Sequence, residues 1–238
     1  MIVHLGCGIG NRIFAIMYML HKYNNNVHFV WEKMGEENVQ FNDLFNASAL
    51  NLSISTYSNS RTIQIHDWIT KDDLKDFNLT GKQISKKSNT IACCTCGYPR
   101  CRKNIAKYIH PHYSLLHDLS TLKDKINTTG YTLHIRNDKH RYTHRTLRKH
   151  MKKFLRLKNY TYIAVERNED VNFLKKINIS TILQDNIRHV QRGRTNMKSL
   201  LSSVFDIYAL SFGNVISTRF HSTFSRLSDC FRQVREST

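Results

Sequence analysis

The 238-residue sequence predicts an α/β protein whose strands form parallel sheets. Short apolar runs alternate with stretches of helical periodicity near both ends of the chain, which is the pattern of βαβ units. A glycine-rich turn separates the first apolar run from the first helical stretch. Hydrophobic residues make up 40% of the chain and only two residues are proline, so long disordered segments are not expected.

The first βαβ unit is predicted at the start of the chain. Met1 to Leu5 is an apolar run that predicts a buried strand, and residues 11–22 carry apolar side chains at helical spacing. Residues 27–31 predict a second strand, which would pair in parallel with the first. Residues 46–105 are polar and weakly periodic, and only short strands are expected there, at 62–65 and 90–93.

A second alternating series begins near Ile126. A strand at 131–135 is followed by a polar turn and a basic helix at 139–158. The remaining predicted elements are strands at 160–165, 181–183 and 214–218 and helices at 171–177, 198–211 and 222–234. Two Rossmann-like α/β halves, residues 1–125 and 126–238, are therefore expected to face each other across a cleft lined by the carboxyl ends of strands.

The chain is strongly basic, with 36 Lys and Arg against 18 acidic residues and a net charge of +18. Such an excess favours polyanionic partners such as nucleic acid, nucleotide phosphates or an anionic membrane surface. The predicted helix at 139–158 holds nine basic residues and no acidic one, and we interpret it as a solvated cationic face. Nucleic acid is therefore not expected as an obligatory partner, and peripheral contact with an anionic membrane stays an alternative.

Compartment and cysteine chemistry are linked. No export signal and no apolar run long enough to cross a membrane is visible, so a soluble cytoplasmic protein is expected. Four of the six cysteines crowd into one segment: Cys93, Cys94, Cys96 and Cys101. Their spacing matches no common structural zinc site of two separated C-x-x-C pairs, although His110 and His112 could add ligands. We expect reduced cysteines, with zinc as the alternative and a disulfide only in an oxidising compartment.

Three glycines at alternate positions, in Gly6-Cys7-Gly8-Ile9-Gly10-Asn11, lie between the first strand and the first helix. Backbone N–H groups in such a turn can close on a phosphate or carboxylate at the positive end of the helix. A nicotinamide site would read G-x-G-x-x-G, and here the third glycine comes one residue early. The pattern also fits a methyltransferase loop for S-adenosylmethionine, with Glu32 placed to bind the ribose, and a simple turn with no ligand.

Two later segments also carry polar side chains at strand ends. Arg136 and Lys139 follow a predicted strand, where a guanidinium can clamp a diphosphate and a lysine can neutralise a leaving group. Ser222 and Thr223 begin the last helix, whose N–H groups and hydroxyls can form a phosphate site. Asp206 lies on a largely apolar helix and needs a partner, either the N–H groups of a guanine or a structural hydrogen bond. Taken singly, these segments also fit a polar turn and a helix cap.

Three motifs, taken in order, resemble the fucosyltransferase superfamily, which includes α1,6-fucosyltransferases and protein O-fucosyltransferases. They are G-C-G-x-G opening a helix, H-x-R-x-D-K after a strand, and D-I-x-x-L-S followed by T/R-F-x-S before a helix. Trp31, the stretch Phe41 to Phe45 and the segment His110 to Tyr113 are also similar to this family. The resemblance implies a GT-B fold, a GDP-sugar donor, above all GDP-fucose, and no metal cofactor.

The resemblance also implies roles for residues and a reaction. The implied donor-binding residues are Gly8, Gly10, His134, Arg136, Asp206, Ser222, Thr223 and Phe224, and the implied catalytic residues are Arg136, Asn11, Asp138 and Lys139. Of these, His134 and Asp206 would bracket the guanine and Arg136 would help GDP depart. The implied reaction is transfer of the sugar to a hydroxyl of a glycan or protein acceptor with inversion at the anomeric carbon. Residues 139–158 contain no acid where relatives place a general base, so the candidates are Asp138, Asp43 and Glu32. Asn11 or a water-assisted dissociative route is the alternative to these acids.

Two other functions stay open from the sequence. A methyltransferase that uses S-adenosylmethionine would explain the glycine loop, but it leaves the segments at 134–139 and 206–224 unexplained. A basic nucleic-acid-binding protein would explain the charge, and it predicts an affinity that falls steeply with salt.

Overall fold

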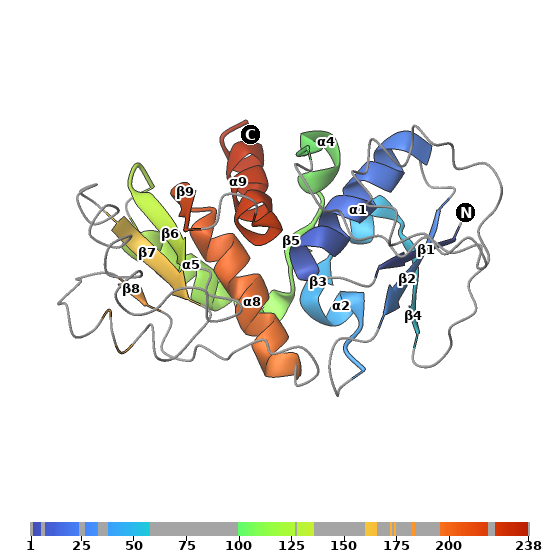
Figure 1. The fold of residues 1–238 in the computed structure, drawn as a ribbon, viewed down its shortest axis with the longest axis horizontal. Helices are drawn as coiled ribbons and strands as arrows, with labels where there is room; N and C mark the ends of the chain where they lie inside the picture. The colour runs from blue at the N-terminus through green and yellow to red at the C-terminus, as the bar shows by residue number, and fades with distance from the viewer. Residues whose placement is uncertain are drawn as a thin grey trace.

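A computed structural model describes two separate parallel sheets, a small antiparallel ladder and the helices packed between and around them (Figure 1). The described residues are 2–5, 8–23, 27–32, 38–57, 100–126, 128–135, 160–165, 172, 174, 182–183, 196–218 and 222–237. The mixture of helices and parallel strands confirms the α/β class.

The N-terminal sheet begins with the predicted βαβ unit. Strand β1 (Ile2–Leu5) is followed by helix α1 (Ile9–Tyr23) and by strand β2 (His28–Glu32), and the two strands pair in parallel with Leu5 opposite Trp31. A third strand, β4 (Ser53–Tyr57), pairs in parallel with the other edge of β2. The order of the sheet is therefore β1-β2-β4.

Strand β4 was not predicted, because it carries polar side chains. Ser53 and Ser55 are exposed, and their hydroxyls bond the two ring nitrogens of His28 at 2.8 and 2.9 Å. An edge strand can satisfy its backbone on one side only and expose polar side chains, so it lacks the apolar run that marks a buried strand.

The middle of the chain contributes short elements. They are α2 (Phe41–Leu44), β3 (Phe45–Asn46), η1 (Ser48–Leu50), α4 (Lys103–Ala106), β5 (His110–Pro111), η2 (Tyr113–Leu115) and α5 (Leu116–Lys125). Strands β3 and β5 pair antiparallel, with Phe45 opposite Pro111, and so join two distant parts of the chain. The strands expected at 62–65 and 90–93 lie outside the described residues.

The second sheet contains every strand predicted after Ile126. Its strands are β6 (Tyr131–Ile135), β7 (Tyr160–Val165), β8 (Ile182–Leu183) and β9 (Asn214–Ser217), in the order β8-β7-β6-β9 and all parallel. Helices α8 (Met197–Leu210) and α9 (Thr223–Arg235) confirm the two C-terminal helices. The basic helix expected at 139–158 lies outside the described residues, and only 172 and 174 of the helix expected at 171–177 are described, both as helical.

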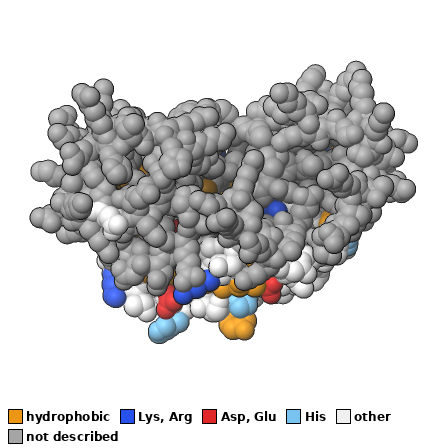
Figure 2. All heavy atoms as spheres, turned by 60° about the horizontal axis from the view of Figure 1, so that its bottom comes forward, with side chains coloured by type: hydrophobic (Ala, Val, Ile, Leu, Met, Phe, Trp, Pro, Cys, Tyr) orange, Lys and Arg blue, Asp and Glu red, His pale blue; other side chains and the backbone are white. Residues whose placement is uncertain are grey.

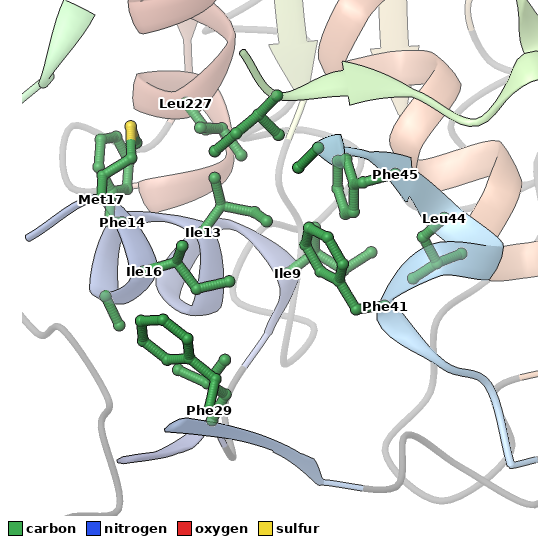
Figure 3. Packing of buried hydrophobic residues seen from close by; sticks show 14 of the residues in the cluster. Ile9, Ile13, Phe14, Ile16, Met17, Phe29, Phe41, Leu44, Phe45 and Leu227 are labelled. Atoms are coloured by element: carbon green, nitrogen blue, oxygen red, sulfur yellow. The ribbon is translucent and has the colours of Figure 1, made fainter. Parts of the chain in front are cut away.

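The main hydrophobic core lies between the two sheets. Ile16 of α1 lies toward Phe29 of β2, and Ile13 on the opposite side of the helix points toward Leu227 of α9 (Figure 3). Helix α8 adds Val204 and other side chains to the same core. The C-terminal helices therefore belong to the packing of the N-terminal sheet as well as to their own, and a smaller cluster with α5 covers the second sheet.

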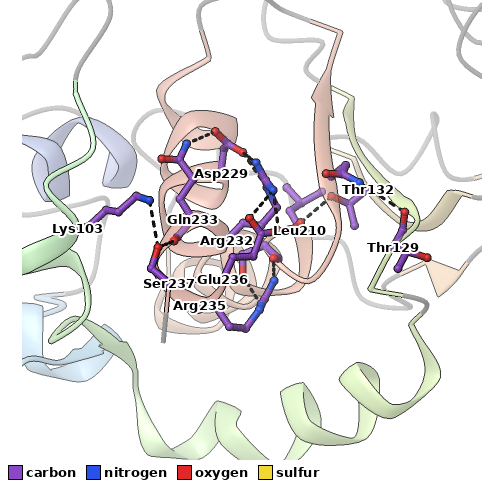
Figure 4. A network of polar contacts seen from close by, with 12 residues as sticks. Lys103, Thr129, Thr132, Leu210, Asp229, Arg232, Gln233, Arg235, Glu236 and Ser237 are labelled. Carbon is purple, nitrogen blue, oxygen red and sulfur yellow. Dashed lines mark hydrogen bonds and ion pairs between the residues drawn. The ribbon is translucent and has the colours of Figure 1, made fainter.

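Polar contacts fix the C-terminal half of α9 (Figure 4). Arg232 forms ion pairs of 2.8 Å with Asp229 and with Glu236 along the helix. Arg235 donates to the backbone carbonyl of Ser211 at the end of α8, and Lys103, the first residue of α4, donates to Ser237 at 3.1 Å. These contacts, together with the core, hold the axis of α9 and hence the position of its first turn.

A disulfide joins Cys101 to Cys230, with the Cα atoms 5.3 Å apart. The expectation of reduced cysteines is therefore wrong for this pair. The partner could not be recognised from local spacing, because it lies 129 residues away and is brought close by the packing of α9 against α4. Because Cys101 is bonded to Cys230, the alternative of a zinc site that uses all four crowded cysteines is also wrong. Cys93, Cys94 and Cys96 lie outside the described residues, and zinc binding by these three stays a prediction.

The surface that the structure describes exposes few large hydrophobic side chains. Tyr108, Tyr113 and Leu116 are the exposed ones, and Figure 2 shows a face on which hydrophobic and histidine side chains protrude together. Among the described residues, no helix has the length and apolar character needed to span a membrane.

Candidate functional site

The first turns of α1 and α9 touch each other at the centre of the molecule. A Cβ atom on Gly10 would lie 2.9 Å from the carbonyl carbon and oxygen of Thr223 and 3.0 Å from the backbone nitrogen of Phe224. Only glycine allows this approach without a shift of the backbone. Gly10 therefore has a packing role that the sequence resemblance did not imply, and it brings the glycine loop to the start of α9.

Gly8 differs from Gly10. It is exposed, and a Cβ there would meet no atom of the described chain within 4 Å. Its backbone carbonyl accepts the first hydrogen bond of α1, from the nitrogen of Arg12 at 3.2 Å. Gly8 thus lies at the open side of the turn, where a ligand has room to approach.

The contact joins the positive ends of two helix dipoles. Each helix N-terminus carries a partial positive charge and N–H groups that lack intrahelical acceptors. Neither first turn contains an acidic side chain that would neutralise this charge. At the start of α9, the Ser222 hydroxyl caps the helix by accepting from the nitrogen of Ser225 at 3.5 Å. Two positive ends so close repel each other, and a bound anion such as a phosphate would relieve the repulsion.

His134 is the second-last residue of β6 and lies beside these helix ends. Its side chain is buried, its Nδ1 atom lies 2.6 Å from the hydroxyl of Ser225, and its ring centre lies 4.7 Å from that of Phe224. Its carbonyl accepts from the nitrogen of Thr218 after β9, at 3.0 Å. The structure therefore brings the predicted residues His134, Ser222, Thr223 and Phe224 together with Gly10.

Asp206 lies on α8 with only 8% of its surface exposed. The Tyr162 phenol of β7 donates a hydrogen bond of 2.5 Å to its carboxylate. Burial raises the pKa of Asp206 to about 7, against a smaller lowering by the hydrogen bond from Tyr162. Burial and the neighbouring carboxylate hold the pKa of the Tyr162 phenol well above its usual value. Of the two partners that the sequence left open for Asp206, the structure contains the structural hydrogen bond.

Asp206 and His134 lie on the same side of the second sheet. Tyr162 of β7 pairs with Thr132 of β6, and His134 comes two residues after Thr132 on the same strand. Side chains two apart on a strand share a face, so this face carries all three. Helix α8 covers it, because the Thr132 hydroxyl donates to the carbonyl of Leu210 at 2.6 Å.

Tyr162 and Arg12 were missed by the sequence interpretation. A tyrosine in the middle of an apolar strand needs a polar partner for its hydroxyl, and this need was the available signal. Arg12 is 2% exposed in the first turns of α1, and its guanidinium lies 4.6 Å from the ring centre of Trp31. A buried arginine directly after the glycine loop is costly without contacts of this kind.

The catalytic roles expected from the sequence stay predictions. Arg136, Asp138 and Lys139 follow β6 directly but lie outside the described residues. Asn11 lies half-buried in the first turn of α1.

The two other candidates for the general base are Asp43 and Glu32. Asp43 accepts a hydrogen bond of 2.7 Å from the backbone nitrogen of Gln40, which makes it a cap of α2. Glu32 ends β2, and its side chain is outside the described part.

Comparison with known proteins gives a likeness in structure alone. No protein family and no curated protein sequence matches the chain. An α1,6-fucosyltransferase, NodZ, co-crystallised with GDP, has a TM-score of 0.60 at 12% identity, over 96% of this chain and 90% of that one. NodZ soaked with GDP-fucose gives 0.59 at 13% identity, over 97% and 91%. NodZ from Bradyrhizobium gives 0.58 at 13% identity, over 96% and 91%. The likeness confirms the expected fucosyltransferase-like fold: the chain shares the fold of these α1,6-fucosyltransferases over nearly its whole length.

Proposed function

We propose that the protein is a glycosyltransferase that moves a sugar, fucose in the first instance, from a GDP-sugar to a hydroxyl of a glycan or protein. The observation that carries the proposal is the contact between the first turns of α1 and α9 beside the pair His134 and Ser225. The fold shared with a fucosyltransferase that was crystallised with GDP supports the same donor.

In this proposal the two sheets form the halves of a GT-B enzyme, and the donor lies between them. The diphosphate takes the position at the two helix N-termini, where Gly8, Ser222 and Thr223 supply backbone and hydroxyl donors. The guanine lies between His134 and Asp206. A carboxylate suits guanine because the N1 and N2 atoms of that base both carry hydrogens.

The proposed chemistry needs one attack and one departure. The acceptor oxygen forms a bond to the anomeric carbon from the side opposite the diphosphate. The bond from that carbon to the β-phosphate oxygen breaks, its electrons leave with GDP, and the hydroxyl proton passes to a base. Arg136 opposes the charge that builds on the leaving phosphate, so its contribution is largest in the transition state. Asp138 is the first candidate for the base, with Asn11 positioned near the sugar.

The cationic groups of the chain and the helix N-termini take the part that a divalent ion plays in metal-dependent transferases. We therefore propose that donor binding and transfer do not need a metal. The acceptor belongs to the same proposal only as a class, a glycan or a protein with a free hydroxyl, and nucleic acid is not part of it.

Calorimetric titration tests the proposed donor. The protein is titrated with GDP, UDP and S-adenosylmethionine, each with and without a chelator of divalent ions. We expect GDP to bind more tightly than UDP, with the same affinity in the presence of chelator, and S-adenosylmethionine not to bind. Binding of S-adenosylmethionine in place of GDP would point to the methyltransferase instead.

A further inference from the structure

Burial of the Asp206 carboxylate lowers the stability of the fold. Asp206 lies on α8 with 8% of its surface exposed, and its neighbours in sequence are the half-buried Phe205 and the buried Ile207. A buried carboxylate loses most of its hydration and stays charged only with hydrogen-bond donors or a positive partner. Among the described residues, the one side chain that donates to it is the phenol of Tyr162, at 2.5 Å.

One phenol uses only part of the hydrogen-bond acceptor capacity of the Asp206 carboxylate. A tyrosine supplies a single O–H donor, whereas an ionised carboxylate has room for about four hydrogen bonds on its two oxygens. The phenol is itself buried at 1% exposure within β7, so its direction is set by the sheet. Tyr162 therefore holds one oxygen of Asp206 in a fixed direction and leaves acceptor capacity for a ligand.

We propose that Tyr162 is a positioning residue for the base of the donor, because its phenol orients the Asp206 carboxylate toward the two N–H groups of a guanine edge. The inference rests on the proposed function, in which Asp206 contacts the guanine. Tyr162 does not touch the ligand in this proposal and acts only through Asp206.

The proposal predicts a preference between nucleobases that depends on how many N–H groups each offers to the Asp206 carboxylate. Guanine offers N1–H and an amino group to one carboxylate, and hypoxanthine offers N1–H alone. With the carboxylate correctly oriented, the wild-type protein prefers GDP to inosine diphosphate by about tenfold, the usual effect of one hydrogen bond to a charged group. Without the phenol the carboxylate can turn, and this preference falls.

The phenol also favours the charged form of Asp206, which is the form that accepts both hydrogens. Other titratable groups lie on elements packed against α8: His134 on β6, His110 on β5, Asp43 on α2, Asp118 on α5 and Asp229 on α9. Burial and Tyr162 are nevertheless the influences on the pKa of Asp206 within the described part of the chain. Affinity for GDP is thus expected to fall as the pH drops through about 7, and to fall from a higher pH when the phenol is removed.

The test is a double-mutant cycle with Tyr162→Phe and Asp206→Asn. The affinities for GDP and inosine diphosphate are measured by calorimetry from about pH 6 to about pH 9. In Tyr162→Phe we expect a GDP affinity several-fold weaker, a smaller preference for GDP, and a pH midpoint displaced upward. In the Asp206→Asn background the same Tyr162→Phe change is expected to have no effect on either affinity, because its action passes through the carboxylate.

A matched control is Tyr208→Phe. Tyr208 is a half-buried tyrosine of α8 itself, and its hydroxyl donates to the carbonyl of Ile109 at 2.7 Å and not to Asp206. Tyr208→Phe is expected to lower the melting temperature without changing the preference for GDP. Should Tyr162→Phe fail to fold, Tyr162→Met, which also lacks the hydroxyl that donates to Asp206, takes its place in the same cycle.

The outcomes are distinguishable. A wild-type protein that does not bind GDP overturns the proposed function. A wild-type protein that binds GDP, together with a Tyr162→Phe variant that keeps the tenfold preference and the pH midpoint, overturns only the role of Tyr162. An equal loss from Tyr162→Phe with and without Asp206 would also overturn it.

Discussion

Gly10 of α1 and Thr223 of α9 lie so close that a single Cβ on Gly10 would come within 2.9 Å of the Thr223 carbonyl group. This contact fixes two helix N-termini beside His134, and the proposed diphosphate site depends on it. A third element, the chain around Cys101, is tied to the same helix α9 through its disulfide.

Gly10→Ala is expected to destabilise the protein, because the new methyl group meets backbone atoms that cannot move away alone. The loss should be about 1–3 kcal/mol, seen as a lower melting temperature in calorimetry. Gly8→Ala is the matched control, since a Cβ there meets none of the described atoms within 4 Å. A Gly10→Ala variant as stable as Gly8→Ala would contradict the packing described here.

Asp206→Asn is expected to raise the melting temperature in alkaline solution while it weakens GDP binding. The folded pKa of Asp206, about 7, exceeds its ordinary value of 3.8, so the folded state keeps a proton that the unfolded state has lost. The stability contributed by this site is present below the ordinary pKa and is lost as the pH rises through about 7. Asparagine cannot ionise but still accepts from Tyr162.

We therefore expect Asp206→Asn to melt a few degrees above the wild type at about pH 8 and close to it at about pH 4, in thermal scans. A carboxylate kept only for stability would give the opposite result, a variant that melts lower at alkaline pH.

Ser225→Ala is expected to weaken GDP binding several-fold, because the imidazole of His134 loses the hydroxyl 2.6 Å from its Nδ1 atom. Ser228→Ala is the comparison, since this buried serine of the same helix bonds the carbonyl of Phe224 at 3.2 Å and not His134. Calorimetry with GDP measures both. Equal affinities for the two variants would show that Ser225 does not position His134.

Reduction of the Cys101–Cys230 disulfide is expected to lower the melting temperature, because it releases a cross-link between positions 129 residues apart. The same reducing agent should leave a Cys101→Ser/Cys230→Ser variant unchanged, and that variant should migrate like the reduced wild type on a non-reducing gel. A wild type with identical melting curves before and after reduction would rule out a stabilising bridge.

Much of the fold was predictable because the chain repeats one clear pattern. The apolar strands at 2–5, 131–135 and 160–165 and the helices α1, α8 and α9 carry strong periodicity, since each buries a whole face. Strand β4 was not predictable in this way, because its serines face solvent and bond His28. Helix α5 was missed because its sequence, LHDLSTLKDK, buries only Leu119 and Leu122.

The candidate site, like the fold, was predictable only in part. The sequence pointed to His134, Ser222 and Thr223 by their places at strand and helix ends, and the structure brings them together. It could not show that Tyr162 is the partner of Asp206, because the pair is separated by 44 residues and joined only by the packing of α8 on β7. Nor could it show that Gly10 serves a contact between helices.

The most direct test of the central claim is the release of GDP from GDP-fucose by purified protein, measured for the wild type, Arg136→Ala and the exposed control Arg100→Ala. The account predicts that the wild type and Arg100→Ala release GDP at similar rates. It predicts that Arg136→Ala is slower by about a hundredfold or more with an unchanged melting temperature. Release by Arg136→Ala at the wild-type rate, or no release by the folded wild type, would contradict the account.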